Sequence, residues 1–460
     1  MRCPVAEKLC SVGLDVGTST TQLIVSQLTV ENRASGFAVP EMEIAQREIL
    51  YKSPVHFTPL LDESRVDGDQ LRVLVEQEYK NAGITPEHVD TGAVIITGET
   101  SRKENAREVL RVLSAFAGDF VVATAGPDLE SVLSAKGAGA ADFSRDTGKT
   151  VLHMDIGGGT SNLSLIREGK IVATGCLNVG GRLIKREKNG RITYVSPVLS
   201  GLTPLQPGDI PGSDQIREVT TLLVQALEMA AGVRKKTELL DKLLTRENIG
   251  AWMPPQESVV VSFSGGVADC IESSQDPLAF GDVGPELGQA IRQSALCRGE
   301  YILGQETIRA TVIGAGCHSA QLSGSTVFYR QVAFPMKNLP VAVLDSREQE
   351  DAGKIAAKIA GMDSSRVVLA LPGYEAPSYG QVRQLAETVA KAAGEREVLV
   401  CLRADMAKAL GHALCLLLPP DRPCLCIDRV ALQEGSYLDI GAPVGPALPV
   451  VVKTLILSQE

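Results

Sequence analysis

Two segments of this chain have a pattern that could bind the phosphates of a nucleotide. Residues 12–25, VGLDVGTSTTQLIV, and residues 151–166, VLHMDIGGGTSNLSLI, each contain an apolar strand, an aspartate, a turn of glycine and threonine, and a second apolar strand. Backbone N–H groups and hydroxyls in such turns attract anions, and an aspartate at the strand end can hold a hydrated metal ion. Facing each other across a cleft, the two turns would hold a nucleotide from both sides, with Asp15 and Asp155 near a magnesium ion.

Neither the first turn (residues 15–20) nor the second turn (residues 155–160) contains a lysine or an arginine. Compensation of phosphate charge is therefore expected from the metal ion and from backbone dipoles. Asp155 is expected to face solvent in the cleft and to contribute little to the core. Each turn alone also fits an ordinary connection between strands, so it is the pair that favours nucleotide binding.

The composition is that of an ordinary globular protein. The chain has 460 residues, of which 44% are apolar and 22% charged, and at about 100–200 residues per domain it should form two to four domains. Its net charge of -10 and the lack of a basic cluster argue against a nucleic-acid partner. Residues 1–10 lack the apolar stretch of a signal peptide, and no run approaches the roughly 18 apolar residues of a membrane span. We therefore expect a cytoplasmic protein with no membrane association.

Cysteines and histidines give no sign of a metal centre. The ten cysteines are scattered along the chain, which is typical of reduced thiols rather than of a disulfide framework. Cys424 and Cys426 are the closest pair, and no other cysteine or histidine cluster lies near them in sequence, which favours buried thiols over a zinc site. The five histidines are equally isolated, and an isolated histidine is more often structural than a ligand or a base.

The periodicity of apolar residues predicts the elements between the two turns. Residues 67–82 are expected to form an amphipathic helix, and residues 93–96 and 120–124 short strands, with a helix from Asn105 between these strands. Residues 129–141 are expected to form one helix of small residues. The order of strand, polar turn and helix is that of an α/β protein.

A third glycine-rich turn follows a predicted strand at residues 259–263. Gly265 and Gly266 at its end would let the backbone approach a flat ligand such as adenine or ribose. A glycine pair also makes ordinary tight turns, so this signal is weak when it stands alone.

The last part of the chain alternates strand and helix signals. Residues 311–325 predict a helix in which Gly314 and Gly316 would permit a close crossing of backbones, as a hinge between domains requires. The chain should divide into a first lobe, a second lobe and a C-terminal α/β region, at residues 1–145, 146–326 and 327–460.

Five segments of the chain occur in an order typical of one superfamily. They are DVGTSTT, VIITGETSRKENAREVL, DIGGGTSNLSL, SFSGGVADC and VIGAGCHSA. Over roughly residues 12–325 they resemble the phosphate-1, connect-1, phosphate-2, adenosine and connect-2 motifs of the actin, sugar kinase and heat-shock chaperone ATPases, most specifically in DIGGGTSNLSL. The whole chain, with TGETSRKENAREVL, SFSGGVADCI, GSYLDIG and LPVVVKTLI, resembles the ethanolamine ammonia-lyase reactivating factors of the EutA type.

This resemblance implies an actin-like ATPase fold, with two ribonuclease H-like lobes around a nucleotide cleft and a C-terminal α/β region. It also implies a chaperone-like, magnesium-dependent ATPase. Its partner would be ethanolamine ammonia-lyase blocked by damaged cobalamin, and ATP binding and hydrolysis would drive release so that intact adenosylcobalamin can enter. The resemblance leaves open a monomer or a homodimer, and a place in the cytoplasm or in a bacterial microcompartment.

The resemblance also assigns roles to individual residues. Asp15 and Asp155 would anchor Mg²⁺, and Asp155 or Glu99 would orient the attacking water. The residues expected to contact ATP are Gly17, Thr18, Ser19, Thr20, Gly157, Gly158, Gly159, Thr160, Gly265 and Gly266.

Two other functions fit the same turns. A small-molecule kinase of this superfamily would need a carboxylate positioned for an acceptor hydroxyl, and Glu99 could serve. An actin-like scaffold would use ATP only to set its conformation. Acceptor dependence of hydrolysis distinguishes the first alternative, and ATP-dependent light scattering the second.

Overall fold

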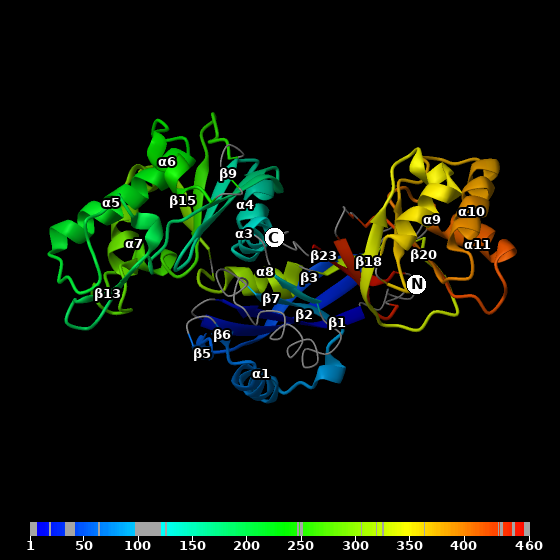
Figure 1. The fold of residues 1–460 in the computed structure, drawn as a ribbon, viewed down its shortest axis with the longest axis horizontal. Helices are drawn as coiled ribbons and strands as arrows, with labels where there is room; N and C mark the ends of the chain where they lie inside the picture. The colour runs from blue at the N-terminus through cyan, green and yellow to red at the C-terminus, as the bar shows by residue number, and fades with distance from the viewer. Residues whose placement is uncertain are drawn as a thin grey trace.

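Three large sheets with their helices, and two two-stranded sheets, β5-β6 and β12-β13, make up the described part of the molecule (Figure 1). The computed structural model describes residues 7–17, 20–32, 42–62, 65–96, 121–124, 127–245, 248, 252–304, 306–318, 320–323, 326–362, 364–430, 432, 436–443 and 447–454. The helix predicted from Asn105 lies outside these residues. Short 3-10 helices within them are η1 (Pro86–His88), η3 (Pro197–Leu199), η5 (Ala268–Cys270), η6 (Ala295–Cys297) and η7 (Glu348–Glu350).

The first sheet has the strand order β3-β2-β1-β7-β8, and β4 also pairs with β2. Strand β2 is antiparallel to its neighbours β3 and β1, whereas β1, β7 and β8 are parallel. The elements are β1 (Glu7–Val16), β2 (Thr20–Asn32), β3 (Met42–Lys52), β4 (His56–Phe57), β5 (Leu60–Asp62), β6 (Arg65–Val66), α1 (Gly68–Ala82), β7 (Thr91–Ile96) and β8 (Val121–Thr124).

Successive residues of a strand point to opposite faces of its sheet. Buried apolar residues lie on both faces of the first sheet. Val12, Leu14 and Val16 of β1 pack in one cluster with Leu71 and Val75 of α1. Helix α1 begins after Asp67, whose side chain accepts a hydrogen bond from the N–H of Gln70, which caps the predicted amphipathic helix. The opposite face is covered by α8 (Ala310–His318).

The second sheet repeats the topology of the first. Its order is β11-β10-β9-β14-β15, again with an antiparallel trio followed by parallel strands. Helices α5, α6 and α7 cover one face, in green in Figure 1. The elements are β9 (Val151–Ile156), β10 (Ser161–Arg167), β11 (Lys170–Leu177), β12 (Ile184–Arg186), β13 (Ile192–Val195), α5 (Ser213–Ala230), α6 (Glu238–Leu243), β14 (Val260–Ser264), α7 (Gly284–Gln293) and β15 (Tyr301–Leu303).

Helices α3 (Pro127–Gly137) and α8 cross at glycines between the two sheets. A Cβ on Gly137 would overlap the carbonyl oxygen of Ala310, and one on Gly314 would overlap that of Leu133. A Cβ on Gly316 would lie 2.8 Å from the Ile24 side chain on β2. The predicted close crossing at Gly314 and Gly316 is therefore confirmed, whereas their role in a hinge stays a prediction.

Two of the predicted helices are wrong in extent. Residues 129–141 form parts of two helices, α3 and α4 (Ala140–Thr147), because Gly139 between them adopts φ +78°, which a right-handed helix does not allow. Residues 311–325 do not form one helix either. After α8, strand β16 (Ala320–Leu322) pairs with β23, and this tertiary pairing overrides local helix propensity.

The third sheet belongs to the C-terminal α/β region, which is yellow to red in Figure 1, except for β16, which precedes that region in sequence. Its order is β16-β23-β22-β18-β19-β20-β21-β17, with β18 to β21 parallel, and α9, α10 and α11 pack on the core made by these strands. The remaining elements are β17 (Phe328–Arg330), β18 (Met336–Val343), α9 (Ala352–Ala360), β19 (Val368–Leu371), α10 (Tyr379–Ala393), β20 (Val398–Leu402), α11 (Ala407–Leu417), β21 (Cys424–Asp428), β22 (Ser436–Ile440) and β23 (Pro449–Thr454).

The predicted mixed α/β fold is confirmed, because the first two parts repeat one mixed sheet with packed helices and the C-terminal part is a further α/β unit. The three domain boundaries stay a prediction.

Candidate functional site

The two predicted turns are built alike. The N–H of Gly17 donates to the carbonyl oxygen of Thr20 at 2.9 Å, and the N–H of Gly157 donates to that of Thr160 at the same distance. Each turn joins two antiparallel strands. The first strand of each pair, β1 or β9, also pairs in parallel with β7 or β14, respectively. The same backbone hydrogen bond therefore closes both predicted turns.

Glycines of the second turn differ in their surroundings. A Cβ on Gly159 would have no heavy atom within 4 Å, and one on Gly157 would meet only the Thr160 carbonyl oxygen, at 3.6 Å. Gly158 is covered by the side chain of Arg182, at 3.3–3.4 Å from the Cβ position. Open space beside Gly159 gives a ligand access to this turn. Thr18 and Ser19 of the first turn lie outside the described residues, as does Glu99.

Asp15 and Asp155 both lie close enough to a third carboxyl group, that of Glu130, for their charges to act on it. Burial raises the pKa of Glu130, and the charges of Asp15 and Asp155 raise it further, to about 8, against a hydrogen bond from Asn162 that lowers it. Glu130 lies in the first turn of α3, and the three carboxyl groups come from three separate elements. The sequence analysis missed this residue.

A signal for Glu130 exists in the sequence. It comes shortly after β8, which is parallel to β7 and β1, and in open α/β sheets ligands bind beyond the carboxyl ends of parallel strands. A helix that begins just past such an end, with a carboxylate in its first turn, is the pattern to look for.

Asp155 is held by hydrogen bonds and is only 8% exposed. Ser264 Oγ donates to Asp155 Oδ1 at 2.5 Å, and Thr311 Oγ1 donates to Oδ2 at 3.4 Å. Burial raises the Asp155 pKa to about 6, although both hydrogen bonds lower it. The expectation that Asp155 faces solvent is therefore wrong, because β9 is covered on both faces and only the strand end reaches the site.

A chain of polar groups continues behind Asp155. Ser264 Oγ also lies 3.0 Å from His153 Nε2, and His153 Nδ1 lies 3.0 Å from Ser262 Oγ. Burial lowers the pKa of His153 to about 3, so its ring is neutral at physiological pH. Because Ser264 donates to Asp155, it accepts from Nε2–H, which leaves Nδ1 to accept from Ser262. His153 is structural, as expected for an isolated histidine, and it orients the serine that holds Asp155.

The two glycines of the third turn play different parts. Gly265 has φ +85°, and a Cβ there would overlap the backbone of Ile156, so its glycine is explained by the turn itself. Gly266 has only Ile308 Cδ1 near its Cβ position, at 3.9 Å. The space beside Gly266 is open to a ligand, and nucleoside binding there stays a prediction.

The carboxylates fit a hydrated magnesium ion. Magnesium is commonly bound by one or two carboxylates together with phosphate oxygens and water, and Asp15 and Asp155 supply such a pair. In the described part of the chain, no group of three or more histidine, cysteine, aspartate or glutamate side chains is arranged to bind a metal by itself. Cys424 and Cys426 are fully buried free thiols on β21, which confirms the sequence prediction.

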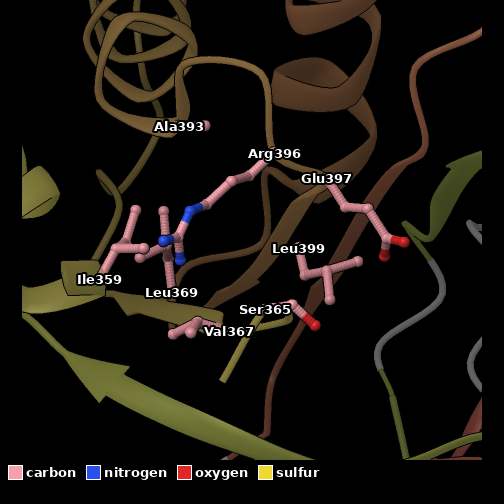
Figure 2. Close-up of a pocket in the computed structure, with 8 residues that line it drawn as sticks. All are labelled: Ile359, Ser365, Val367, Leu369, Ala393, Arg396, Glu397 and Leu399. Carbon is pink, nitrogen blue, oxygen red and sulfur yellow. The ribbon is translucent and has the colours of Figure 1, made fainter. Parts of the chain in front are cut away.

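A small cavity lies among described residues of the C-terminal region (Figure 2). It has about 10 Å³ of accessible volume and lies among Ile359, Ser365, Val367, Leu369, Ala393, Arg396, Glu397 and Leu399. That volume is about enough for one water molecule, so this cavity is no site for a nucleotide or a cobalamin. Among the helices of the described ranges, we find none with the length and apolar character needed to cross a membrane.

Comparison with known structures gives matches over two thirds of the chain. A PPX-GPPA enzyme from Aquifex aeolicus is 13% identical, with a TM-score of 0.41, over 67% of this chain and 99% of the other. The activator of 2-hydroxyisocaproyl-CoA dehydratase from Clostridium difficile, solved with bound ADPNP, is also 13% identical, with a TM-score of 0.30, over 67% of this chain and 96% of the other.

Similarity to a curated protein covers nearly the whole chain. The ethanolamine ammonia-lyase reactivase EutA of Salmonella typhimurium is 38% identical over 473 residues, which is 97% of this chain and 98% of the relative. The model of the ethanolamine utilisation protein EutA family matches residues 7–458. This chain therefore belongs to the ethanolamine utilisation protein EutA family.

Proposed function

We propose that this chain is a magnesium-dependent ATPase that reactivates ethanolamine ammonia-lyase. ATP binding and hydrolysis would drive the release of damaged cobalamin, so that intact adenosylcobalamin can bind the lyase. Family membership supports the reactivase role. The observation that carries the ATPase role is the pair of equivalent turns, with the same Gly N–H to Thr carbonyl bond in each, whose aspartates both act on Glu130.

Phosphate binding falls to the backbone of the two turns. Amides of the first turn would contact the terminal phosphates from one side, and those of Gly157 to Thr160 from the other. Mg²⁺, when bound, neutralises phosphate charge. Asp15 and Asp155 hold its water ligands, and Ser264 fixes the direction in which Asp155 points.

We assign the orientation of the attacking water to Glu130. Asp155 already accepts one hydrogen bond on each oxygen, from Ser264 and Thr311, and its remaining acceptor sites are assigned to the waters of Mg²⁺. Glu130 acts on both aspartates from a different element and is half-buried at the site. Phosphoryl transfer depends mainly on positioning and charge neutralisation, so one oriented water suffices for slow hydrolysis. Glu99 stays a prediction from the sequence.

Coupling to the lyase would pass through α3 and α8. These helices cross at Gly137 and Gly314 without intervening side chains, and α8 also packs against Gly13 of β1. A nucleotide that binds a closed arrangement of the two sheets more tightly than an open one shifts that equilibrium, and with it the affinity of a distant surface for the lyase.

A homodimeric state, and a location in the cytoplasm or in a microcompartment, belong to the same proposal.

The test is the recovery of blocked lyase. Ethanolamine ammonia-lyase inactivated with cyanocobalamin is supplied with adenosylcobalamin, ATP and Mg²⁺, together with the native chain, the Asp155→Asn variant or no addition. Asparagine keeps the acceptor for Ser264 and removes the charge, so the variant should fold. We expect ethanolamine deamination to return with the native chain alone. No recovery by a native chain that binds ATP would reject the reactivase role, and equal recovery by the variant would reject the assigned site.

A further inference from the structure

The negative charge expected at the site is not offset by any basic side chain of the two turns. A nucleoside triphosphate carries several negative charges, and Asp15, Asp155 and Glu130 add carboxyl groups, whereas neither turn contains a basic residue. One magnesium ion offsets part of this charge. The structure shows a basic side chain, Arg182, lying directly on the second turn, although it is distant from the turn in sequence.

The loop after β11 positions Arg182. The N–H of Gly181 donates to the carbonyl oxygen of Gly157 at 3.0 Å, and the N–H of Arg182 donates to that of Gly158 at 2.6 Å. A Cβ on Gly180 would overlap the backbone of Gly158, so this glycine allows the two backbones to lie in contact. The Arg182 Cβ, Cγ and Cδ atoms then cover Gly158 at 3.3–3.4 Å from its Cβ position.

The guanidinium group of Arg182 is weakly held. Within the described part of the chain the guanidinium group contacts Asp282, with 3.4 Å between Arg182 Nε and Asp282 Oδ2. The Arg182 side chain is 30% exposed. Ordinary charge-assisted hydrogen bonds are about 2.7–2.9 Å long. Asp282 itself is fixed, because its Oδ1 accepts from the N–H of Gly284 at 2.8 Å.

Arg186, four residues further on, shows what a structural arginine looks like in this region. Its Nη2 donates to both carboxylate oxygens of Glu286, at 2.8 and 2.9 Å, and to the carbonyl oxygens of Pro277 and Asp282, at 2.8 and 2.6 Å. Only 6% of the Arg186 side chain is exposed. Arg186 is committed to the fold, whereas Arg182 has donors to offer to a ligand.

We infer that Arg182 is a phosphate-binding residue that pairs with the β- and γ-phosphates of a nucleoside polyphosphate at the second turn. Asp282 holds its guanidinium group when no nucleotide is bound. A planar guanidinium offers two parallel N–H donors to phosphate oxygens, which an ammonium group does not. Arg182 therefore favours nucleoside di- and triphosphates over adenosine. This inference rests on the proposed function, because it requires the nucleotide site.

The experiment measures dissociation constants for ATP, ADP and adenosine by calorimetry, with Mg²⁺ present. We expect Arg182→Ala to weaken ATP and ADP binding about tenfold or more, because charge-assisted bonds are lost, and to leave adenosine binding within about twofold. Arg182→Lys should restore part of the loss. Arg167→Ala is the matched control, since Arg167 lies at the far end of β10 in an exposed ion pair with Glu257, and it should bind ATP like the native chain.

A second variant tests the holding role of Asp282. Asp282→Asn keeps an oxygen for the Gly284 N–H and removes the charge that competes with phosphate, so its ATP affinity should equal or exceed the native value. A loss as large as that of Arg182→Ala would reject the holding role.

Each remaining outcome separates this inference from the proposed function. If the native chain binds ATP and Arg182→Ala binds it equally well, Arg182 is no phosphate ligand, although the nucleotide site stands. If adenosine binding falls as much as ATP binding, the residue is structural. If the native chain binds no ATP, the proposed ATPase function and this inference are both wrong.

Discussion

The first and second sheets have the same strand order and the same turn, but they differ in what stands behind the aspartate. Across the parallel ladder from Asp155 lies Ser264, which donates to it, whereas the equivalent position beside Asp15 is Ile95, whose side chain cannot donate. Across the antiparallel ladder the partners are Asn162 and Gln22. At this one ladder position the repeated strand pair therefore has a hydroxyl in one half and an apolar side chain in the other.

The two turns are also supported from outside in different ways. Thr58 Oγ1 donates to the carbonyl oxygen of Gly17 at 2.7 Å, so a side chain supports the first turn. The second turn is supported by backbone donors, from Gly181 and Arg182. A substitution of Thr58 can remove the side-chain donor to the first turn, whereas substitution of Gly181 or Arg182 leaves the backbone donors to the second turn in place.

The largest effect is expected from Asp155→Asn. Removing the charge takes away one of the two carboxylates that hold the waters of Mg²⁺, so magnesium-dependent ATP hydrolysis should fall by about 100-fold or more. Asparagine still accepts from Ser264, so the thermal unfolding temperature should stay near that of the native chain. A steady-state phosphate-release assay measures the rate, and a native rate would show that this aspartate is no magnesium anchor.

A slightly smaller effect on hydrolysis is expected from Glu130→Gln. Loss of the carboxylate removes the group that orients water, which should cost about 100-fold in single-turnover hydrolysis. ATP affinity should change little near neutral pH, because the raised pKa of Glu130, about 8, leaves its carboxyl group mostly protonated, so the substitution removes little negative charge. Glu87→Gln, an exposed change in η1, is the control. A variant that hydrolyses ATP normally would return the role to Asp155 or Glu99.

Ser264→Ala tests the polar support directly. Asp155 would lose its short hydrogen bond, and its carboxylate could rotate, so the apparent affinity for Mg²⁺ should fall about tenfold, as for other residues that orient metal ligands. Magnesium titration of ATP hydrolysis gives this number. Partial rescue by Ser264→Thr would confirm that the hydroxyl matters. If Ile95→Val at the equivalent position of the first sheet has an equal effect, the contrast between the two halves is wrong.

The smallest effect is expected from Thr58→Val, which keeps the shape of the side chain and removes the donor to Gly17. One ordinary hydrogen bond contributes about 1 kcal/mol, so ATP affinity should fall by about threefold to tenfold. Because Thr21 also hydrogen-bonds Thr58, Thr21→Val is a useful companion and should weaken ATP binding less. Unchanged affinity in Thr58→Val would mean that the first turn keeps its shape without this support.

Much of the fold could be predicted because local patterns agree with it. The helix at residues 67–82 has its cap at Asp67, and the strand at residues 259–263 appears as β14. The glycines of both turns can be recognised in the sequence, because they follow an aspartate at the end of an apolar strand. Such features are determined by residues close together in the chain.

Residues brought in by packing could not be predicted in the same way. Glu130 reaches the site because α3 crosses to the second sheet, and Arg182 reaches the second turn because β11 returns beside β10. Ser264 meets Asp155 through the register of two parallel strands. Each of these contacts joins segments far apart in sequence. The start of α3 after β8 marks Glu130 as a candidate, but the local patterns do not show which residues it meets.

The position of β23 bears on how the molecule assembles. This strand lies between β16 and β22, and the whole C-terminal α/β region separates β16 from it in sequence. Parallel strands β18 to β21 with their helices can collapse first, since their contacts are the more local ones, whereas pairing of distant strands is slow. We expect the ladder between β16 and β23 to form late. Until then the C-terminal region is a folded unit tethered to α8 at one end only.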